Sequence, residues 1–156
     1  MSEVQSLVRM EAVEAAARPV MLYDGECGMC SASVQFILAR ERRQTLLFAP
    51  SQGTFAGEVR RRHPELAGAD SVIWLEPARP GREERAYIRS DALLRVAAYL
   101  GLPWSLLGVF RMVPRSLRDA VYRVVARNRH RWSRGRAACI RTTPQQQARF
   151  LDHVGS

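Results

Sequence analysis

The sequence predicts an α/β fold, in which helices flank a four-stranded mixed sheet and a C-terminal helical extension follows. Three observations support this prediction. Short apolar runs bounded by turn residues alternate with segments of helical period. The loop after the third apolar run contains a Pro-Gly dipeptide and leads to a fourth run, as in a β-hairpin. The last third of the chain shows helical patterns followed by a basic segment.

The first half of the predicted sheet domain contains two strand–helix units. Residues 20 to 23 form a short apolar run that ends at the turn dipeptide Asp24-Gly25, which is typical of a buried strand. From Cys30 onward, apolar residues at helical spacing predict an amphipathic helix. Residues 46 to 49 predict a second buried strand, and residues 54 to 62 a short helix.

The second half predicts a hairpin and a third helix. Residues 71 to 75 and 85 to 89 are the predicted hairpin strands. Ser90 is expected to cap a helix that runs over residues 91 to 100. Because parallel strands connected through a helix cross over with a right-handed turn, the first two strands should be parallel neighbours. The hairpin should then add antiparallel partners.

The helical extension is predicted as a hairpin over residues 104 to 113 and 115 to about 127. Its second helix is expected to pack in the core through an apolar stripe, Leu117, Val121 and Val124. We divide the chain of 156 residues into an N-terminal helical or disordered arm (1–17), the sheet domain (18–101), and an extension with a basic tail (102–156) packed on the same domain. No apolar segment resembles a secretory signal or reaches the length of a membrane span, so we expect a cytoplasmic protein.

Positive charge is concentrated near the C-terminus. The formal net charge is +9, and residues 111 to 141 hold ten Arg and one Asp. Such a segment attracts anions, so one hypothesis is a binding module that grips nucleic acid, a membrane surface or an acidic protein. Nucleic acid is the less favoured partner, because the arginines are accompanied by two aromatic residues, Tyr122 and Trp132, and by no recognised DNA-binding motif.

The favoured hypothesis rests on the Cys-x-x-Cys pair, Cys27 and Cys30, between a predicted strand and a predicted helix. At a helix N-terminus, unpaired N–H groups and the helix dipole favour a thiolate. We expect Cys27 to be the exposed nucleophile with a lowered pKa, and Cys30 the more buried resolving thiol. The alternatives are two apolar core residues or part of a zinc site, for which Cys139 and the three histidines lack companions at ligand spacing. Thiol–disulfide exchange needs no metal or organic cofactor.

Other residues are candidates for supporting roles. The Asp24 carboxylate either accepts the proton of Cys30 during resolution or simply forms an Asp-Gly turn. Ser90 and Asp91 begin a helix on the side of the cysteines, where they either hold a small thiol cosubstrate or cap the helix. Gly28 and Met29, between the two cysteines, are candidate substrate-binding residues.

The segment Asp24-Gly25-Glu26-Cys27-Gly28-Met29-Cys30 resembles the signature of the DCC family of thiol-disulfide oxidoreductases. The resemblance covers about residues 19 to 141 and includes Phe48-Ala49-Pro50, Asp70-Ser71-Val72, Ser90-Asp91-Ala92-Leu93-Leu94 and residues 113 to 129. It implies a thioredoxin-like fold and disulfide reductase or exchange activity. The expected partners are a disulfide-bearing protein or small thiol, and an external thiol as electron donor.

Compared with thioredoxin, the chain differs at three places. The dipeptide Gly28-Met29 lacks a proline, and Glu26 replaces the aromatic residue that commonly precedes the first cysteine. Both differences bear on the reduction potential. Thioredoxins carry a cis-proline before the third strand, where this chain has Asp70-Ser71, so the backbone clamp for a disulfide-bearing peptide is expected to be weaker.

Cys139 is a possible third redox thiol. It follows the last predicted helix in a basic stretch and resembles a cysteine that recurs near the end of DCC family chains. Arg136 and Arg141 should favour its thiolate, which would then act as an alternative resolving thiol for Cys27. The competing hypothesis is a partly buried thiol that holds the tail in place.

Overall fold

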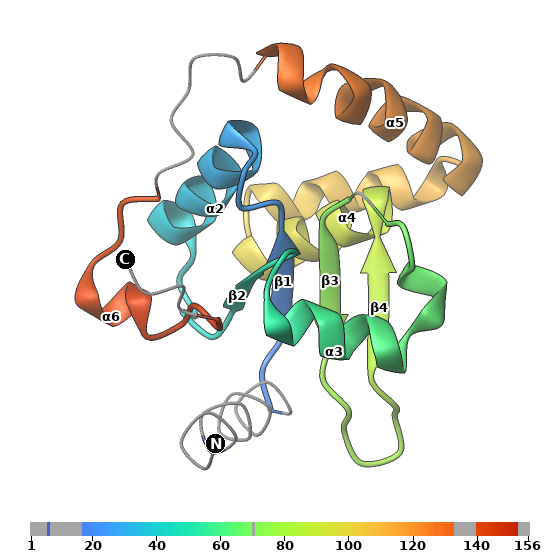
Figure 1. Ribbon diagram of the computed structural model, residues 1–156. Helices are drawn as coiled ribbons and strands as arrows, with labels where there is room; N and C mark the ends of the chain where they lie inside the picture. Colours follow the sequence, from blue (N-terminus) through green and yellow to red (C-terminus); the bar gives the residue numbers. More distant parts are fainter. Residues whose placement is uncertain (1–5, 7–16, 70, 133–139, 153–156) are drawn as a thin grey trace.

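Four strands form one mixed sheet in the order β2-β1-β3-β4 (Figure 1). The computed structural model describes residues 6, 17–69, 71–132 and 140–152. Strand β1 pairs in parallel with β2 and antiparallel with β3, and β3 pairs antiparallel with β4. The strands are β1 (Val20–Tyr23), β2 (Leu47–Pro50), β3 (Ile73–Glu76) and β4 (Arg85–Ile88). The α/β fold, the mixed sheet and its pairing are therefore confirmed.

Helices cover both faces of this sheet, because successive strand residues point to opposite faces. Val20 and Leu22 lie in one core cluster, with the apolar residues of α3 (Thr54–Arg62) and of the short 3-10 helix η1 (Pro64–Leu66). Met21 and Tyr23 lie in a second cluster with α2 (Gly28–Arg40) and α4 (Arg89–Leu100). In Figure 1, α3 crosses the front of the sheet, on the face opposite to α2 and α4.

Helix α4 begins earlier than predicted. Its N-cap is Ile88, which makes no side-chain capping bond, and Arg89 is its first residue. The prediction that Ser90 caps this helix is therefore wrong. The Ser90 hydroxyl lies within the first turn and donates to the Asp119 carboxylate of the extension instead.

The extension consists of a 3-10 helix, η2 (Trp104–Met112), and the long helix α5 (Arg115–Trp132). Helix α5 runs across the top of the molecule in Figure 1. The predicted core stripe is wrong, because Leu117, Val121 and Val124 are 57 to 60% exposed. The side chains of Arg118 and Tyr122, on another face of α5, contact the sheet domain. Within the described ranges, no helix combines the length and apolarity needed to cross a bilayer.

The described C-terminal segment returns to the edge of the sheet through α6 (Pro144–Gln147). The backbone of Phe48 in β2 bonds to residues 149 and 151 at 2.9 and 2.8 Å. Arg149 is buried and forms an ion pair with Glu41, just beyond the end of α2. The other oxygen of the Glu41 carboxylate accepts the Tyr99 hydroxyl hydrogen at 2.6 Å. These bonds hold the segment around Arg149 against the second core cluster.

Candidate active site

The two thiols lie at the N-terminus of α2, directly after β1. Cys27 is the N-cap residue of α2, and its carbonyl accepts the Ser31 N–H at 3.0 Å. Cys30 lies in the first turn, and both residues are free thiols. The first N–H groups of a helix have no intrahelical acceptors and stabilise negative charge. The predicted placement of the pair between a strand and a helix start is therefore found.

The expected difference in exposure is not found. Cys27 is 2% exposed and Cys30 6%, so the prediction of an exposed Cys27 is wrong. Helix α5 packs beside α2, and its Arg129 reaches the strand end that leads into the thiol pair. The sequence pattern of α5 gives no sign of this long-range contact.

Burial raises the pKa of the Cys30 thiol to about 12. A hydrogen bond to Cys27 and the Cys27 charge contribute to this rise, whereas the Arg129 charge and the Asp24 backbone N–H oppose it. Because the bond to Cys27 favours the protonated form, Cys30 is the donor in this pair. Cys30 therefore keeps its proton at neutral pH, which is the state expected of a resolving thiol before attack.

Asp24 is close to the pair, and its carboxylate is held from three sides. One oxygen accepts the Glu26 N–H at 3.0 Å and the Gln52 side-chain amide at 2.9 Å. The other lies 3.5 Å from the Arg129 guanidinium. The bond to Glu26 is the Asx turn expected of an Asp-Gly sequence. The turn hypothesis is thus confirmed, and proton transfer by the same carboxylate stays a prediction.

Sequence reasoning missed two residues that α5 brings to this site. The side chain of Arg129 is 8% exposed and pairs with Asp24. The Tyr122 hydroxyl accepts the Val72 N–H at 3.4 Å, and burial raises the pKa of this tyrosine. Tyr122 follows Arg118 by four residues, and Arg129 follows Tyr122 by seven, so all three lie on one face of α5. This spacing is visible in the sequence.

A polar cavity of about 200 Å³ adjoins the Asp24 carboxylate. Its lining includes Gln52, Arg60, Ser71 and Arg129. The Ser71 hydroxyl is buried and has no hydrogen-bond partner among the described residues. A cavity of this size and polarity has room for water beside the acid.

Ser90 and Asp91 connect α4 to α5. The Asp91 carboxylate pairs with Arg118 at 2.9 Å and with Arg115 at 3.1 Å, and Ser90 donates to Asp119. These side chains therefore hold the extension against the sheet domain. Their binding of a thiol cosubstrate stays a prediction.

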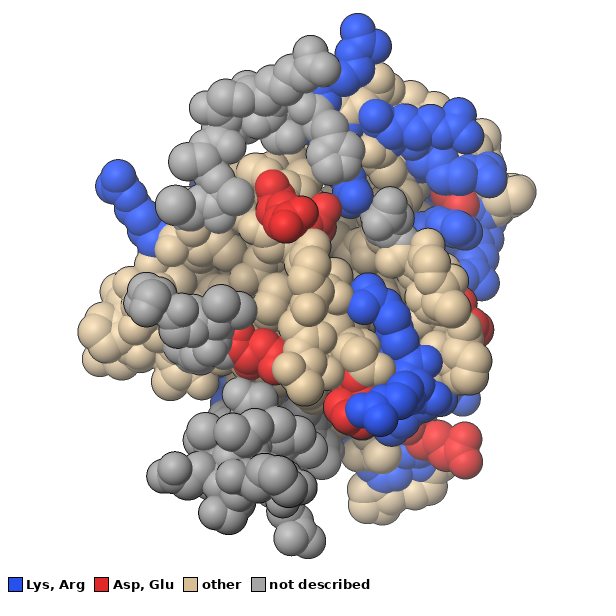
Figure 2. Space-filling view, in the orientation of Figure 1, with Lys and Arg blue, Asp and Glu red and all other residues tan. Residues whose placement is uncertain are grey.

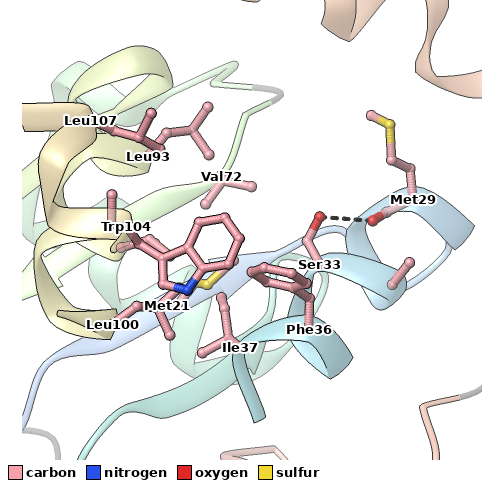
Figure 3. A pocket seen from close by; sticks show the side chains of 13 residues that line it. Met21, Met29, Ser33, Phe36, Ile37, Val72, Leu93, Leu100, Trp104 and Leu107 are labelled. Carbon is pink, nitrogen blue, oxygen red and sulfur yellow. Dashed lines mark hydrogen bonds between the residues drawn. The ribbon is translucent and has the colours of Figure 1, made fainter. Parts of the chain in front are cut away.

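An apolar groove of about 500 Å³ lies beside the cysteine motif (Figure 3). Met29, from the Cys-x-x-Cys segment, lies at its end, where its carbonyl accepts the Ser33 hydroxyl. Phe36 of α2 and Trp104 of η2 meet edge to face, with ring centres 5.0 Å apart. Ligand sites commonly enclose about 300–1,000 Å³ and are mostly apolar, so this groove has the size and lining of one.

Several of the remaining candidates lie outside the described residues, namely Cys139, His153 and Asp70. His63 lies far from the cysteines in the chain, and its ring nitrogens contact Glu65 and Glu84 at 2.9 and 3.0 Å. Where the structure describes the chain, no three His, Cys, Asp or Glu side chains gather as metal ligands would.

Comparison with known proteins agrees with the chemistry of this site. Residues 21–135 match the family described as DCC1-like thiol-disulfide oxidoreductase. The uncharacterized protein YuxK of Bacillus subtilis (strain 168) is 31% identical over 133 residues, which are 85% of this chain and 93% of that protein. The chloroplastic DCC family protein At1g52590 of Arabidopsis thaliana is 31% identical over 115 residues, or 72% of this chain and 63% of that protein. No solved structure is significantly similar to the chain.

Proposed function

This chain belongs to the DCC1-like thiol-disulfide oxidoreductase family, and we propose that it reduces protein or peptide disulfides through Cys27 and Cys30. The observation that carries the proposal is the asymmetry of the pair. Both thiols lie at the N-terminus of α2, and Cys30 donates to Cys27 while burial raises the pKa of Cys30 to about 12. This asymmetry supports attack by Cys27 and resolution by Cys30.

The reaction takes place in two steps. The Cys27 thiolate attacks one sulfur of a substrate disulfide, so that the substrate S–S bond breaks and a mixed disulfide with Cys27 forms. The other substrate sulfur leaves as a thiolate. Cys30 then loses its proton and attacks the Cys27 sulfur, which forms the Cys27–Cys30 disulfide and releases the second substrate thiolate. Two electrons pass to the substrate, and an external thiol donor returns them to the protein.

Resolution needs a base, because the raised pKa keeps Cys30 protonated. The Asp24 N–H contacts the Cys30 sulfur, and the Asp24 carboxylate borders the polar cavity of about 200 Å³. We assign proton removal to this carboxylate, acting directly or through one water molecule in the cavity. The charge of Arg129 lowers the pKa of Cys30 and so stabilises the thiolate that forms on Cys30 as its proton leaves.

The groove beside Met29 favours substrates with apolar residues next to the disulfide. An extended peptide bound there would bury apolar side chains against Phe36 and Trp104. A compartment such as the cytoplasm would regenerate the pair, because cellular thiol systems keep such cysteines reduced. The proposed partners are thus an apolar disulfide-bearing polypeptide and a thiol reductant.

A redox titration combined with turnover tests this function. The pair should interconvert between dithiol and disulfide in glutathione or dithiothreitol buffers. The reduced protein should also reduce a cystine peptide with apolar flanking residues faster than one with polar flanking residues. A pair that never forms an intramolecular disulfide in these buffers, or that forms one without turning over any peptide, would contradict the proposal.

Replacement of Arg129 by Gln should slow the second step about tenfold, which corresponds to one pKa unit of lost charge stabilisation. Single-turnover kinetics of the mixed disulfide measure this step. Arg127→Gln is the matched control, because Arg127 is exposed on the same helix. Equal mixed-disulfide lifetimes in the two variants would mean that Arg129 acts only in packing.

A further inference from the structure

Helix α5 faces the sheet domain with one side only. Arg118 pairs with Asp91 at 2.9 Å, and the Tyr122 hydroxyl accepts the Val72 N–H at 3.4 Å. Arg129 completes this inner face with its ion pair to Asp24. These contacts fix the rotation of α5 about its axis, and therefore also fix which residues point away from the protein.

The outer face of α5 consists of Leu117, Val121, Val124 and Trp132, all of which are exposed. Successive intervals of four, three and eight residues place them on one side of the helix. The preceding helix η2 exposes further large apolar side chains: Leu106, Val109, Phe110 and Met112. Exposed apolar side chains aligned along one face of a helix, as in α5, mark an interaction surface.

Arginines flank this apolar face. Arg123, Arg127 and Arg131 follow one another at intervals of four residues, and all three are exposed. In Figure 2 one group of basic side chains lies at the upper right, over α5, with uncharged side chains between them, and another lies at the lower right. Within α5 the one acidic residue is Asp119, which bonds Ser90 on the inner side.

This combination of apolar and basic faces distinguishes between partners. Nucleic acid would use the arginines, but it would leave the aliphatic side chains in water. A second copy of the chain could cover the apolar face, but it would bring two rows of like-charged arginines together. An anionic lipid surface satisfies both faces, because apolar side chains enter the boundary of the acyl chains while arginines meet the headgroups.

We propose that the outer face of α5, with the exposed end of η2, docks the protein on the surface of an anionic membrane. The helix lies in the plane of the interface, and Trp132 is placed where an aromatic ring is favoured. The docking is independent of the thiol chemistry, because neither cysteine belongs to the outer face.

Vesicle flotation with the full-length protein tests the proposal. The protein should bind vesicles of phosphatidylcholine with phosphatidylglycerol, and bind phosphatidylcholine alone far more weakly. The triple variant Arg123→Gln, Arg127→Gln, Arg131→Gln should lose on the order of a hundredfold in affinity for the anionic vesicles. The control Arg42→Gln, Arg79→Gln, Arg82→Gln removes the same charge from exposed positions outside α5, and it should bind like the natural chain.

A second triple variant, Leu117→Gln, Val121→Gln, Val124→Gln, separates a lipid surface from other anionic partners. It should lose at least tenfold in vesicle affinity and keep its affinity for heparin and DNA. Circular dichroism checks that α5 remains helical. Unchanged vesicle affinity in this variant would overturn the proposal in favour of a purely electrostatic contact. A stable lipid-free dimer that this variant dissociates would overturn it in favour of self-association.

Discussion

Replacement of Cys27 by Ser is expected to reduce disulfide turnover to the uncatalysed background, because the raised pKa of Cys30 keeps the remaining thiol of the pair protonated. Burial alone is the largest cause of the raised Cys30 pKa, so Cys30 stays protonated near neutral pH after Cys27 is removed. Turnover of a cystine peptide measures the loss. Cys30→Ser is the matched variant, and it should complete the first step and accumulate the mixed disulfide.

Alkylation of the natural protein checks the same assignment. Iodoacetamide should modify Cys27 before Cys30, and slowly, because Cys27 is almost wholly buried. Mass spectrometry after brief labelling gives the order. If Cys30 reacts first, or if Cys27→Ser retains turnover, the two roles are assigned the wrong way round.

Replacement of Arg149 by Leu should destabilise the fold by about 3–5 kcal/mol, a large share of the stability of a domain of this size. The substitution leaves the Glu41 carboxylate without its cation, in a place where its side chain has no exposure to water. The Tyr99 hydroxyl would remain as its hydrogen-bond donor. Urea unfolding followed by circular dichroism measures the loss.

A double variant isolates the cause of this effect. Arg149→Leu combined with Glu41→Gln removes both charges and keeps an oxygen that accepts the Tyr99 hydroxyl. It should regain most of the lost free energy of unfolding. Arg61→Leu, which breaks an exposed pair with Glu58, should cost less than about 1 kcal/mol. A double variant as unstable as Arg149→Leu would show that the loss of stability comes from the packing of the Arg149 side chain and not from its charge.

The sheet could be predicted because its strands are short runs bounded by turn residues, and because three of them, β1, β2 and β3, are largely buried. Residues 20–23 are apolar throughout, as a strand covered on both faces must be, and the structure places β1 there without a shift. The helix over residues 54 to 62 was likewise bounded correctly, because a proline follows it. The Cys-x-x-Cys pair needed no long-range information, since β1 and α2 position it locally.

The rest of the site depends on contacts between distant segments. Asp24, directly after β1, pairs with Arg129 of α5. The local sequence pattern around either residue does not specify this pairing. The periodicity of Leu117, Val121 and Val124 predicts an apolar helix face, but not what covers it. The structure turns Arg118, Tyr122 and Arg129 inward instead, so polar groups on α5 complete the thiol site.

A thiol site of this kind cannot be grafted onto another protein without Arg129 and Tyr122. A fragment ending at Gly101 would keep all four strands and both cysteines, and its sequence looks like a self-sufficient module. It would nevertheless lose the guanidinium beside Asp24 and the phenol on Val72. Strand β1 and helix α2 alone therefore do not carry the complete site. Evolution or design that reuses it has to carry the long C-terminal helix along.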